Sequence, residues 1–264
     1  MYCEDCGLAL PLRLTESLAI ILTSFSADNN VINTILVPKG PEYKAVCQGL
    51  SRANSSTPLV IPIPIGPQPL TEYLEKLRQA GHFLNRPQPR VLLMGLCGSL
   101  TPRYQVGDVV LYQSCVYMSN ASTPLVQPCA PELTTMLDNH LQERVSLVTA
   151  LTSDRLIYSA SEKRHLSQLY GADVVDMEGF AALEVLSRVG VAVAMIRVVS
   201  DDARHNIPNL NLALSPDGSL QSLPLAIGLI GQPIAAARLI RGALRGLQVL
   251  QQVTTRLFAE GGRQ

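Results

Sequence analysis

The chain has 264 residues, of which 47% are hydrophobic and 16% charged, and its 21 basic residues balance its 21 acidic ones. This length and composition predict a sizeable core, and the absence of net charge leaves no strong field to attract nucleic acid, which we exclude as a partner. The six cysteines are scattered and mostly flanked by apolar residues, which is typical of reduced thiols in a cytoplasmic protein.

The first residues fit neither a signal peptide nor a membrane-spanning helix. Their apolar stretch follows Glu4 and Asp5 instead of basic residues, and proline and charged residues interrupt it. Residues 1–30 are therefore predicted to be an N-terminal extension outside the folded core. Cys3 and Cys6 form a lone C-x-x-C pair, and because a structural zinc site needs two more ligands, we expect no metal.

From residue 31 onward, short apolar runs alternate with helical patterns, which is typical of an α/β protein whose mostly parallel sheet is covered on both faces. Pro41 marks one helix start, and Ser159 has capping-box spacing to Glu162 ahead of another. The predicted strands are residues 32–37, 59–65, 91–94, 109–112, 146–150, 173–177 and 191–199. The predicted helices are residues 42–52, 71–79, 131–142, 163–169, 179–189 and 234–258.

Two acidic segments carry the functional prediction. Glu178 opens a helix, and Asp201 ends the apolar strand that follows it. A right-handed crossover between parallel strands would return both carboxylates to one sheet edge, where α/β folds bind small ligands. Taken alone, each acid has a simpler reading, as a helix-start charge or a turn cap. Arg197 lies inside the same apolar strand, and because an unpaired buried charge is costly, we expect it to have a carboxylate partner.

After these strands, turn residues lead into the long helix at residues 234–258. Its apolar positions recur at helical spacing, with arginines distributed around them. The pattern favours a helix packed on the domain or on a second subunit. A basic amphipathic surface, making peripheral contact with a membrane or a lipid-like substrate, is the alternative. We expect a folded domain at residues 31–215 and a helical C-terminal extension at residues 216–264.

Three ordered segments resemble the superfamily of purine nucleoside phosphorylases and methylthioadenosine/S-adenosylhomocysteine nucleosidases. They are residues 91–100 with 106–110, residues 176–182, and residues 197–201. The resemblance implies a three-layer α/β/α fold with a mixed, partly barrel-like sheet. It also implies a homo-oligomeric enzyme that breaks the N-glycosidic bond of a purine nucleoside without a cofactor. The tail from residue 208 resembles hopanoid-associated members, which remove adenine from adenosylhopane, and this favours a hydrophobic 5′ substituent.

The resemblance also implies roles for individual residues. Asp201 would protonate or hydrogen-bond the departing purine, Glu178 would hold the ribose hydroxyls, and Met177 would line the sugar pocket. Glu42 resembles the carboxylate that activates water in nucleosidases. The remaining substrate-binding candidates are Gly95, Ser200 and Ile157.

Water is the expected nucleophile. Hexameric phosphorylases grip phosphate with an arginine and a serine, whose places here correspond to Leu93 and Leu96, and leucine offers no donor. A phosphate-dependent phosphorylase is the runner-up, and a non-catalytic nucleoside-binding homologue is a further alternative. A cysteine hydrolase built on Cys97 is disfavoured, because a poor helix start follows it. A dehydrogenase is disfavoured because no complete G-x-G-x-x-G motif follows a first strand.

Overall fold

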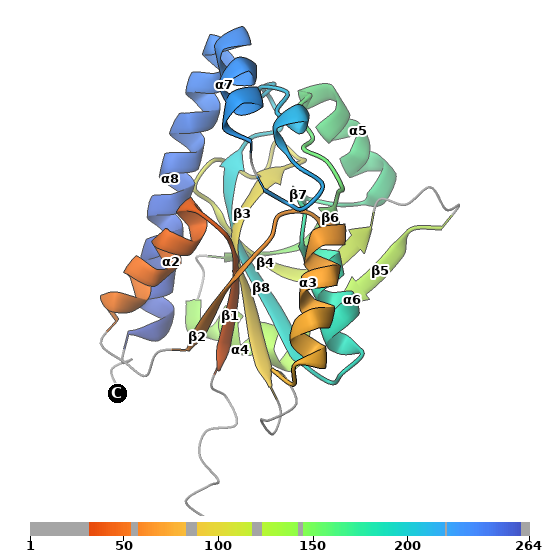
Figure 1. Cartoon of the computed structure of the whole chain (residues 1–264), viewed down its shortest axis with the longest axis vertical. Helices are drawn as coiled ribbons and strands as arrows, with labels where there is room; N and C mark the ends of the chain where they lie inside the picture. Colours follow the sequence, from red (N-terminus) through yellow and green to blue (C-terminus); the bar gives the residue numbers. More distant parts are fainter. Residues whose placement is uncertain are drawn as a thin grey trace, which may run out of the picture. The chain divides into compact units, whose positions relative to one another are not determined.

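The computed structural model describes residues 32–53, 58–82, 89–117, 123–141, 145–219 and 221–259. The expected extension at residues 1–30 lies outside the described residues, as do Cys3 and Cys6. From Ile32 onward the chain forms one compact unit. The expected boundary after residue 215 stays a prediction. Helices flank a central sheet on both sides, as Figure 1 shows.

Most of the predicted strands and helices are present. The strands are β1 (Thr34–Pro38), β2 (Leu59–Ile63), β3 (Arg90–Ser99), β4 (Val109–Tyr117), β5 (Leu125–Pro128), β6 (Val145–Thr152), β7 (Val174–Asp176) and β8 (Ala192–Asp201). The helices are α2 (Pro41–Ser51), α3 (Pro67–Gln79), α4 (Pro131–Leu141), α5 (Ala160–Tyr170), α6 (Gly179–Ser187), α7 (Ser222–Gly231) and α8 (Pro233–Phe258), with a 3-10 turn η2 (Asn211–Ala213). The sequence did not predict β5 or α7.

Local sequence explains where two of the helices begin. Ser159 caps α5, because its side chain accepts a hydrogen bond from the Glu162 backbone N–H at 3.4 Å, as the capping-box spacing predicted. α3 begins earlier than the predicted Thr71, at Pro67. Proline suits a first helical position, and Gly66 before it has a φ of 97°, which favours glycine.

The strands form one mixed sheet of eight, in the order β2-β1-β3-β7-β6-β4-β5. β8 lies off this path, where it pairs in parallel with β3 and antiparallel with β4. Because β3, β7, β6, β4 and β8 each pair with the next and β8 returns to β3, these five strands close into a barrel. The predicted three-layer fold with a partly barrel-like sheet is confirmed.

One step of the sequence argument is wrong. β7 runs antiparallel to β3, with Val175 opposite Gly98, whereas β8 runs parallel to β3. β7 and β8 therefore run in opposite directions, and no parallel crossover brings their carboxyl ends to one edge. The cause is barrel closure, since the short strand β7 joins β3 to β6. The end of β7 points back along β3 toward the middle of β8, which brings Glu178 to Arg197.

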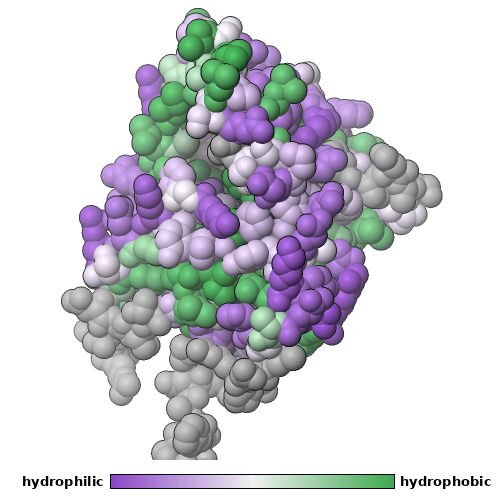
Figure 2. Space-filling model, viewed as in Figure 1, coloured by the Kyte–Doolittle hydropathy of each residue, from purple (hydrophilic) through white to green (hydrophobic). Residues whose placement is uncertain are grey.

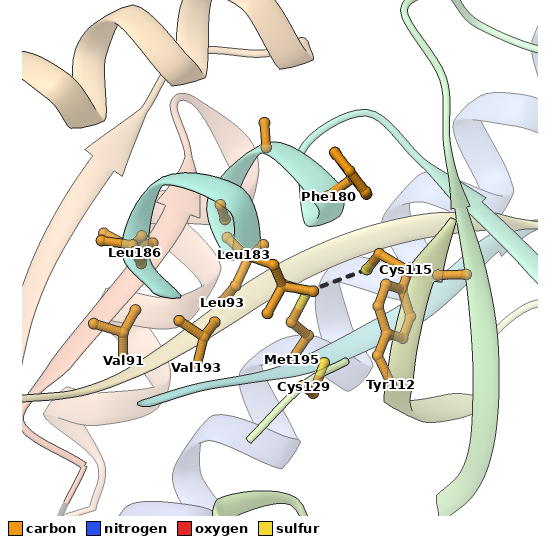
Figure 3. Packing of buried hydrophobic residues seen from close by; sticks show 14 of the residues in the cluster. Val91, Leu93, Tyr112, Cys115, Cys129, Phe180, Leu183, Leu186, Val193 and Met195 are labelled. Carbon is orange, nitrogen blue, oxygen red and sulfur yellow. Dashed lines mark hydrogen bonds between the residues drawn. The ribbon is translucent and has the colours of Figure 1, made fainter. Parts of the chain in front are cut away.

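An apolar core fills the space between the barrel and α6. Figure 3 shows Leu183 and Leu186 of α6 above Val193 and Met195 of β8, with Cys115 of β4 at the far side. The Cys115 sulfur lies 3.8 Å from the Met195 sulfur. Burying each large apolar side chain contributes about 1.5–3 kcal/mol. This packing holds the start of α6, and with it the preceding acidic segment, against the barrel.

The long helix α8 packs on the domain, against α2 and β8, as the favoured prediction stated. Two glycines of α8 let its backbone approach β8 and β3 closely. A side chain at Gly242 would collide with the Ser200 carbonyl oxygen, and a Cβ at Gly246 would lie 2.9 Å from the Leu96 side chain. Within the described ranges, no single helix is long and apolar enough to cross a membrane. α7 and α8 taken together meet those criteria, but the chain bends by 119° between them.

Candidate functional site

Arg197 lies at the centre of the candidate site. Its side chain is fully buried, and Nη2 donates to Asp176 Oδ2 at 3.0 Å and to Glu178 Oε2 at 3.1 Å. The predicted carboxylate partnership is thereby confirmed. Burial opposes the charge, but the two carboxylates hold the pKa of Arg197 above its usual value. Nε and Nη1 have no hydrogen-bond partner among the described residues, so the guanidinium has two buried nitrogen atoms whose donors are unpaired.

Asp176 is held in place from the start of α6. Its Oδ1 accepts from the Thr152 hydroxyl at 2.8 Å, and its carboxylate accepts from the Gly179 backbone N–H at 3.1 Å. The Thr152 oxygen in turn accepts from the Phe180 N–H at 2.9 Å. A helix N-terminus has unpaired N–H groups and a positive dipole end, which stabilise a carboxylate there. Asp176 is therefore a fixed anion that orients the Arg197 guanidinium.

Glu178 is buried and reaches two separate parts of the fold. Besides its bond to Arg197, its Oε1 accepts from the Gly66 N–H at 3.2 Å, just before α3. Burial raises the pKa of Glu178 to about 7, although Arg197 pulls it down. Its side chain makes no capping hydrogen bond to α6. Glu178 is the N-cap residue of α6, and its carboxylate is held by Arg197 and Gly66 instead of by a hydrogen bond to that helix.

Glu42 enters the same site from α2. Its Oε1 accepts from the Leu96 N–H at 2.6 Å, and burial raises its pKa while Arg197 opposes the rise. A Cβ at Gly95 would lie 2.8 Å from Glu42 Oε1 and would collide with Arg197 Nη1. Glycine at position 95 thus lets the acid and the guanidinium approach over the β3 backbone.

Asp201 forms a second group at the end of β8. Its Oδ2 forms an ion pair with Nζ of Lys163, a fully buried residue of α5, and its Oδ1 accepts from the Ser200 hydroxyl at 3.0 Å. Lys163 Nζ also donates to the Asp202 carbonyl at 3.0 Å. A Cβ at Gly98 would lie 2.9 Å from Asp201 Oδ2, so glycine again makes room on β3. The turn-cap reading fails for Asp201, because Asp202 is the residue that accepts from the backbone N–H groups of the turn.

The two groups lie along the same pair of strands. Gly95 is opposite Arg197 in the β3–β8 register, and Gly98 is opposite Asp201. The two glycines are three positions apart along β3, a span of about 10 Å. We refer to the acids around Arg197 as the sugar-end group and to the pair of Asp201 with Lys163 as the base-end group, after the roles that the family resemblance implies; these roles stay predictions.

Two predicted residues lie outside these contacts. Met177 is half-buried next to Glu178 in the sequence. The Ile157 side chain packs inside a hydrophobic cluster, and the backbone of neighbouring Leu156 is paired in both directions with the Asn211 side chain. Roles for Met177 and Ile157 in substrate binding stay predictions, as do the roles of the other predicted site residues.

Sequence reasoning missed Lys163. The residue follows the capping box of α5, and a lysine in the first turn of a helix is almost never fully buried unless it is paired, so no local signal marks it. Its partner lies 38 residues further along the chain. Asp176 lies in the segment of residues 176–182 that carries the resemblance, but nothing in the sequence distinguished it from Glu178 as a partner for Arg197.

A pocket of about 420 Å³ adjoins the sugar-end group. Gly66, which donates to Glu178, is part of its wall, and Tyr117 of the wall stacks on Phe180 with ring centroids 5.3 Å apart. Small-molecule pockets usually measure about 300–1,000 Å³, so the size suits a ligand. Its other lining residues include Ile65, Pro67, Asp154, Arg155, Leu214 and Pro216.

Cys97 is not arranged as a nucleophile. Its side chain is buried, and burial raises the pKa of the thiol far above its usual range. The thiolate is the reactive form, so this thiol is inert. Cys47, Cys97, Cys115 and Cys129 are free cysteines. Among the described residues, no group of three or more potential metal-binding side chains comes together.

The chain is similar to one protein family and to solved structures of one fold. A family model described as "Phosphorylase superfamily" matches residues 32–213, well over half of the chain. No curated protein matches the sequence. The 5′-methylthioadenosine/S-adenosyl homocysteine nucleosidase of Helicobacter pylori is 15% identical, with a TM-score of 0.60 over 83% of this chain and 94% of that one.

Two further solved structures have the same fold. The corresponding nucleosidase of Campylobacter jejuni is 14% identical, with a TM-score of 0.56 over 83% of this chain and 98% of that one. The futalosine hydrolase of Helicobacter pylori is 16% identical, with a TM-score of 0.57 over 83% of this chain and 95% of that one.

Proposed function

The chain belongs to the phosphorylase superfamily, and from this premise we propose that it hydrolyses the N-glycosidic bond of a purine nucleoside, with adenine as the leaving base. One observation carries the proposal, the cluster of two buried carboxylates, Asp176 and Glu178, and the half-buried Glu42 around Arg197. The names of the solved structures that share this fold, which are nucleosidases and a futalosine hydrolase, agree with it.

In the proposed reaction, the bond between the anomeric carbon of ribose and the purine nitrogen breaks, and its electron pair leaves with the base. Water adds its oxygen to the anomeric carbon, a water proton passes to Glu42, and the purine gains a proton from Asp201. Positive charge develops on the ribose, and nearby carboxylates stabilise it. Glu178 accepts hydrogen bonds from the ribose hydroxyls, and Met177 lines the sugar. The products are a free base and a free sugar.

Lys163 serves the base end as a positioning residue. Its ammonium contacts both Asp201 and the Asp202 carbonyl, so it fixes the carboxylate and shares the proton that the purine receives. General acid assistance is typically worth about 100- to 10,000-fold in rate. An ammonium can give up a proton and regain it, whereas a guanidinium stays charged. The buried lysine therefore provides a renewable proton for Asp201.

The charge of the sugar-end group favours water over phosphate. Arg197 already pairs with two carboxylates, and a third, Glu42, lies beside it. A phosphate dianion would have to approach against these acids, and like charges in a buried site repel strongly. Leu93 is buried in the core, and the Leu96 side chain faces Gly246 of α8, so neither supplies a donor to an anion.

Product analysis tests the nucleophile. Purified protein is incubated with adenosine, inosine and methylthioadenosine, with and without inorganic phosphate, and the sugar product is identified. We expect free sugar at the same rate in both buffers. Strict dependence on phosphate, with a sugar 1-phosphate as product, would establish the phosphorylase alternative. A lack of turnover with every nucleoside, together with nucleoside binding, would indicate a non-catalytic homologue.

We further propose a hydrophobic 5′ substituent on the substrate, as in adenosylhopane. The pocket beside Glu178 is partly apolar, with Ile65, Pro67 and Leu214 in its wall, and the resemblance of the tail to hopanoid-associated proteins points the same way. Peripheral contact with membrane lipid through the C-terminal segment is part of this proposal. We propose that the protein is cytoplasmic and that it forms a homo-oligomer.

Competition between two nucleosides tests the substituent. The values of kcat/KM for methylthioadenosine and for an adenosine with a long apolar 5′ group are measured in the same detergent buffer. We expect the apolar nucleoside to have the higher kcat/KM, because its substituent contributes binding energy in the pocket. A preference for the methylthio group would remove the hopanoid assignment and leave the hydrolysis proposal intact.

A further inference from the structure

α7 is an apolar helix with no buried residue. Leu223, Ile227 and Ile230 follow the i, i+4, i+7 spacing of a single helix face, with exposed fractions of 72%, 64% and 79%. Ile234, at the start of α8, is 77% exposed. Figure 2 shows hydrophobic residues gathered over this end of the molecule, where Figure 1 places α7. An exposed apolar patch of this kind marks an interaction surface.

Basic side chains border this apolar face. A depression of about 560 Å³ at the junction of α7 and α8 is lined by Ile234 together with Arg204, His205 and Arg238. From residue 218 to residue 259 the sequence contains no aspartate or glutamate, whereas α8 carries several arginines. The surface is therefore apolar in its centre and cationic along its border.

The two arginines of the depression are free to meet an anion. Arg204 donates to the Pro102 carbonyl at 3.4 Å, and Arg238 donates to the Asn206 carbonyl at 3.3 Å. In the described part of the chain, neither arginine forms an ion pair with a carboxylate. The nearby acid, Asp202, is paired with His205 at 3.0 Å.

We infer that this surface docks on a bilayer that contains anionic lipid. The α7 surface, as we call it, consists of Leu223, Ile227, Ile230 and Ile234 with Arg204 and Arg238. α7 itself carries no charge, and the basic border comes from Arg204 and Arg238; together they give the apolar and cationic surface that suits a membrane interface, and α7, at 10 residues, is too short to span a bilayer. A two-fold contact between copies is disfavoured, since the α7 surface offers no carboxylate with which the arginines of a second copy could pair.

The α7 surface lies near the pocket, so docking on a membrane would bring the pocket to the lipid. Leu214 and Pro216 line the pocket beside Glu178, and α7 begins a few residues later and packs against η2. Docking through α7 would hold the pocket close to the lipid surface, where an apolar nucleoside resides. The inference deepens the lipid contact proposed above, and its link to the pocket also rests on the proposed activity, whereas binding to lipid itself needs no turnover.

Vesicle flotation of the full chain tests the inference. The vesicles contain phosphatidylcholine alone or phosphatidylcholine mixed with phosphatidylglycerol. We expect the protein to float with the mixed vesicles and to lose affinity at least tenfold in the Ile227→Ser, Ile230→Ser double variant. Each of Arg204→Gln and Arg238→Gln should cost about fivefold, with less dependence on salt. The matched control is Leu125→Ser, an exposed apolar residue of β5, which should bind like the parent.

Other results would overturn the inference. These are no binding of the parent protein to mixed vesicles, equal binding by the isoleucine double variant, or equal loss in the Leu125→Ser control. A double variant that binds no lipid but also dissociates an oligomer, as sized by light scattering without vesicles, would assign the surface to a second copy. Turnover of soluble methylthioadenosine, measured in parallel, should be unchanged. Its absence in all samples would count against the nucleosidase alone.

Discussion

The sugar-end and base-end groups both contain a fully buried cation, but they use it differently. Arg197 sits inside the barrel between two carboxylates, and its charge is permanent. Lys163 comes from α5 and pairs with one carboxylate and one carbonyl oxygen. An arginine with two anions builds a rigid frame, whereas a lysine with one anion can pass a proton. Under the proposed function, the first group frames the site and the second takes part in proton transfer.

The largest effect is expected at the base end, from Asp201→Asn. The amide cannot supply the proton, so kcat should fall about 100- to 10,000-fold while nucleoside binding persists. Steady-state kinetics and equilibrium binding measure the two properties. Asp202→Asn is the matched control, since this neighbouring acid pairs with His205 at the surface, and its kcat should stay close to that of the parent. Equal losses in both variants would refute the assignment of Asp201.

Arg197→Met tests the structural side of the comparison. The substitution leaves Asp176 and Glu178 buried without their cation, and breaking such a pair typically costs about 3–5 kcal/mol. Urea denaturation at neutral pH should show this loss in the free energy of unfolding. A loss below about 1 kcal/mol would mean that the guanidinium is not the frame of the sugar end.

Lys163 should matter less for the fold than for the pH profile. Lys163→Met is expected to lower kcat about 10- to 100-fold at neutral pH and to retain more activity in acid, where Asp201 can take its proton from solvent. Lys163→Arg keeps a charge but cannot release a proton, so it should not restore the parent profile. If Lys163→Arg restored the parent pH profile of kcat, the lysine would act only through its positive charge and not by passing a proton. Circular dichroism of both variants shows whether the fold is retained.

The smallest effect concerns pH and stability at the sugar end. Burial raises the pKa of Glu178 to about 7 and also raises that of Glu42, so the folded protein holds protons that the unfolded chain has lost. The contribution of these two groups to the free energy of unfolding is complete at low pH and is lost as pH rises through the folded-state pKa. The free energy of unfolding should therefore fall as pH rises from about 4.5, the usual pKa of a glutamate, to about 7, and less steeply in Glu42→Gln.

The same titration should have the opposite effect on catalysis. Glu42 must be ionised to accept a proton from water, so kcat/KM of the parent should rise over the pH range in which the fold loses stability. A pH profile of kcat/KM with a flat acid limb, extending below the range of an ordinary glutamate, would show that no carboxyl group of raised pKa acts in the reaction.

Much of the fold could be predicted from local patterns. Apolar runs without alternation mark the buried strands, and all five residues of β1 are indeed buried. Pro41 and Ser159 mark the starts of α2 and α5. β5 and α7 escaped prediction for physical reasons. β5 is short and largely exposed, and α7 is apolar all round, so neither shows the periodicity by which an element is recognised.

The candidate site was predictable in part. A charge inside an apolar strand requires a partner, so Arg197 implied a carboxylate. The identity of that carboxylate, and the antiparallel path by which Glu178 reaches it, depended on barrel closure. The burial of Lys163 depended on how α5 packs against the end of β8. Contacts of this kind join distant parts of the chain and leave no local periodicity.

The sequence by itself determined the class of fold and most of its elements. It also identified a charged residue in an apolar strand, Arg197, that needed a partner of opposite charge. Only the tertiary structure decided which charged residues meet. In the folded chain two carboxylates form ion pairs with Arg197, and Lys163 forms an ion pair with Asp201. The apolar face of α7 stays uncovered. Local propensity acts over a few residues, whereas the energy of a buried charge depends on whatever the closed barrel brings within a few ångströms of it.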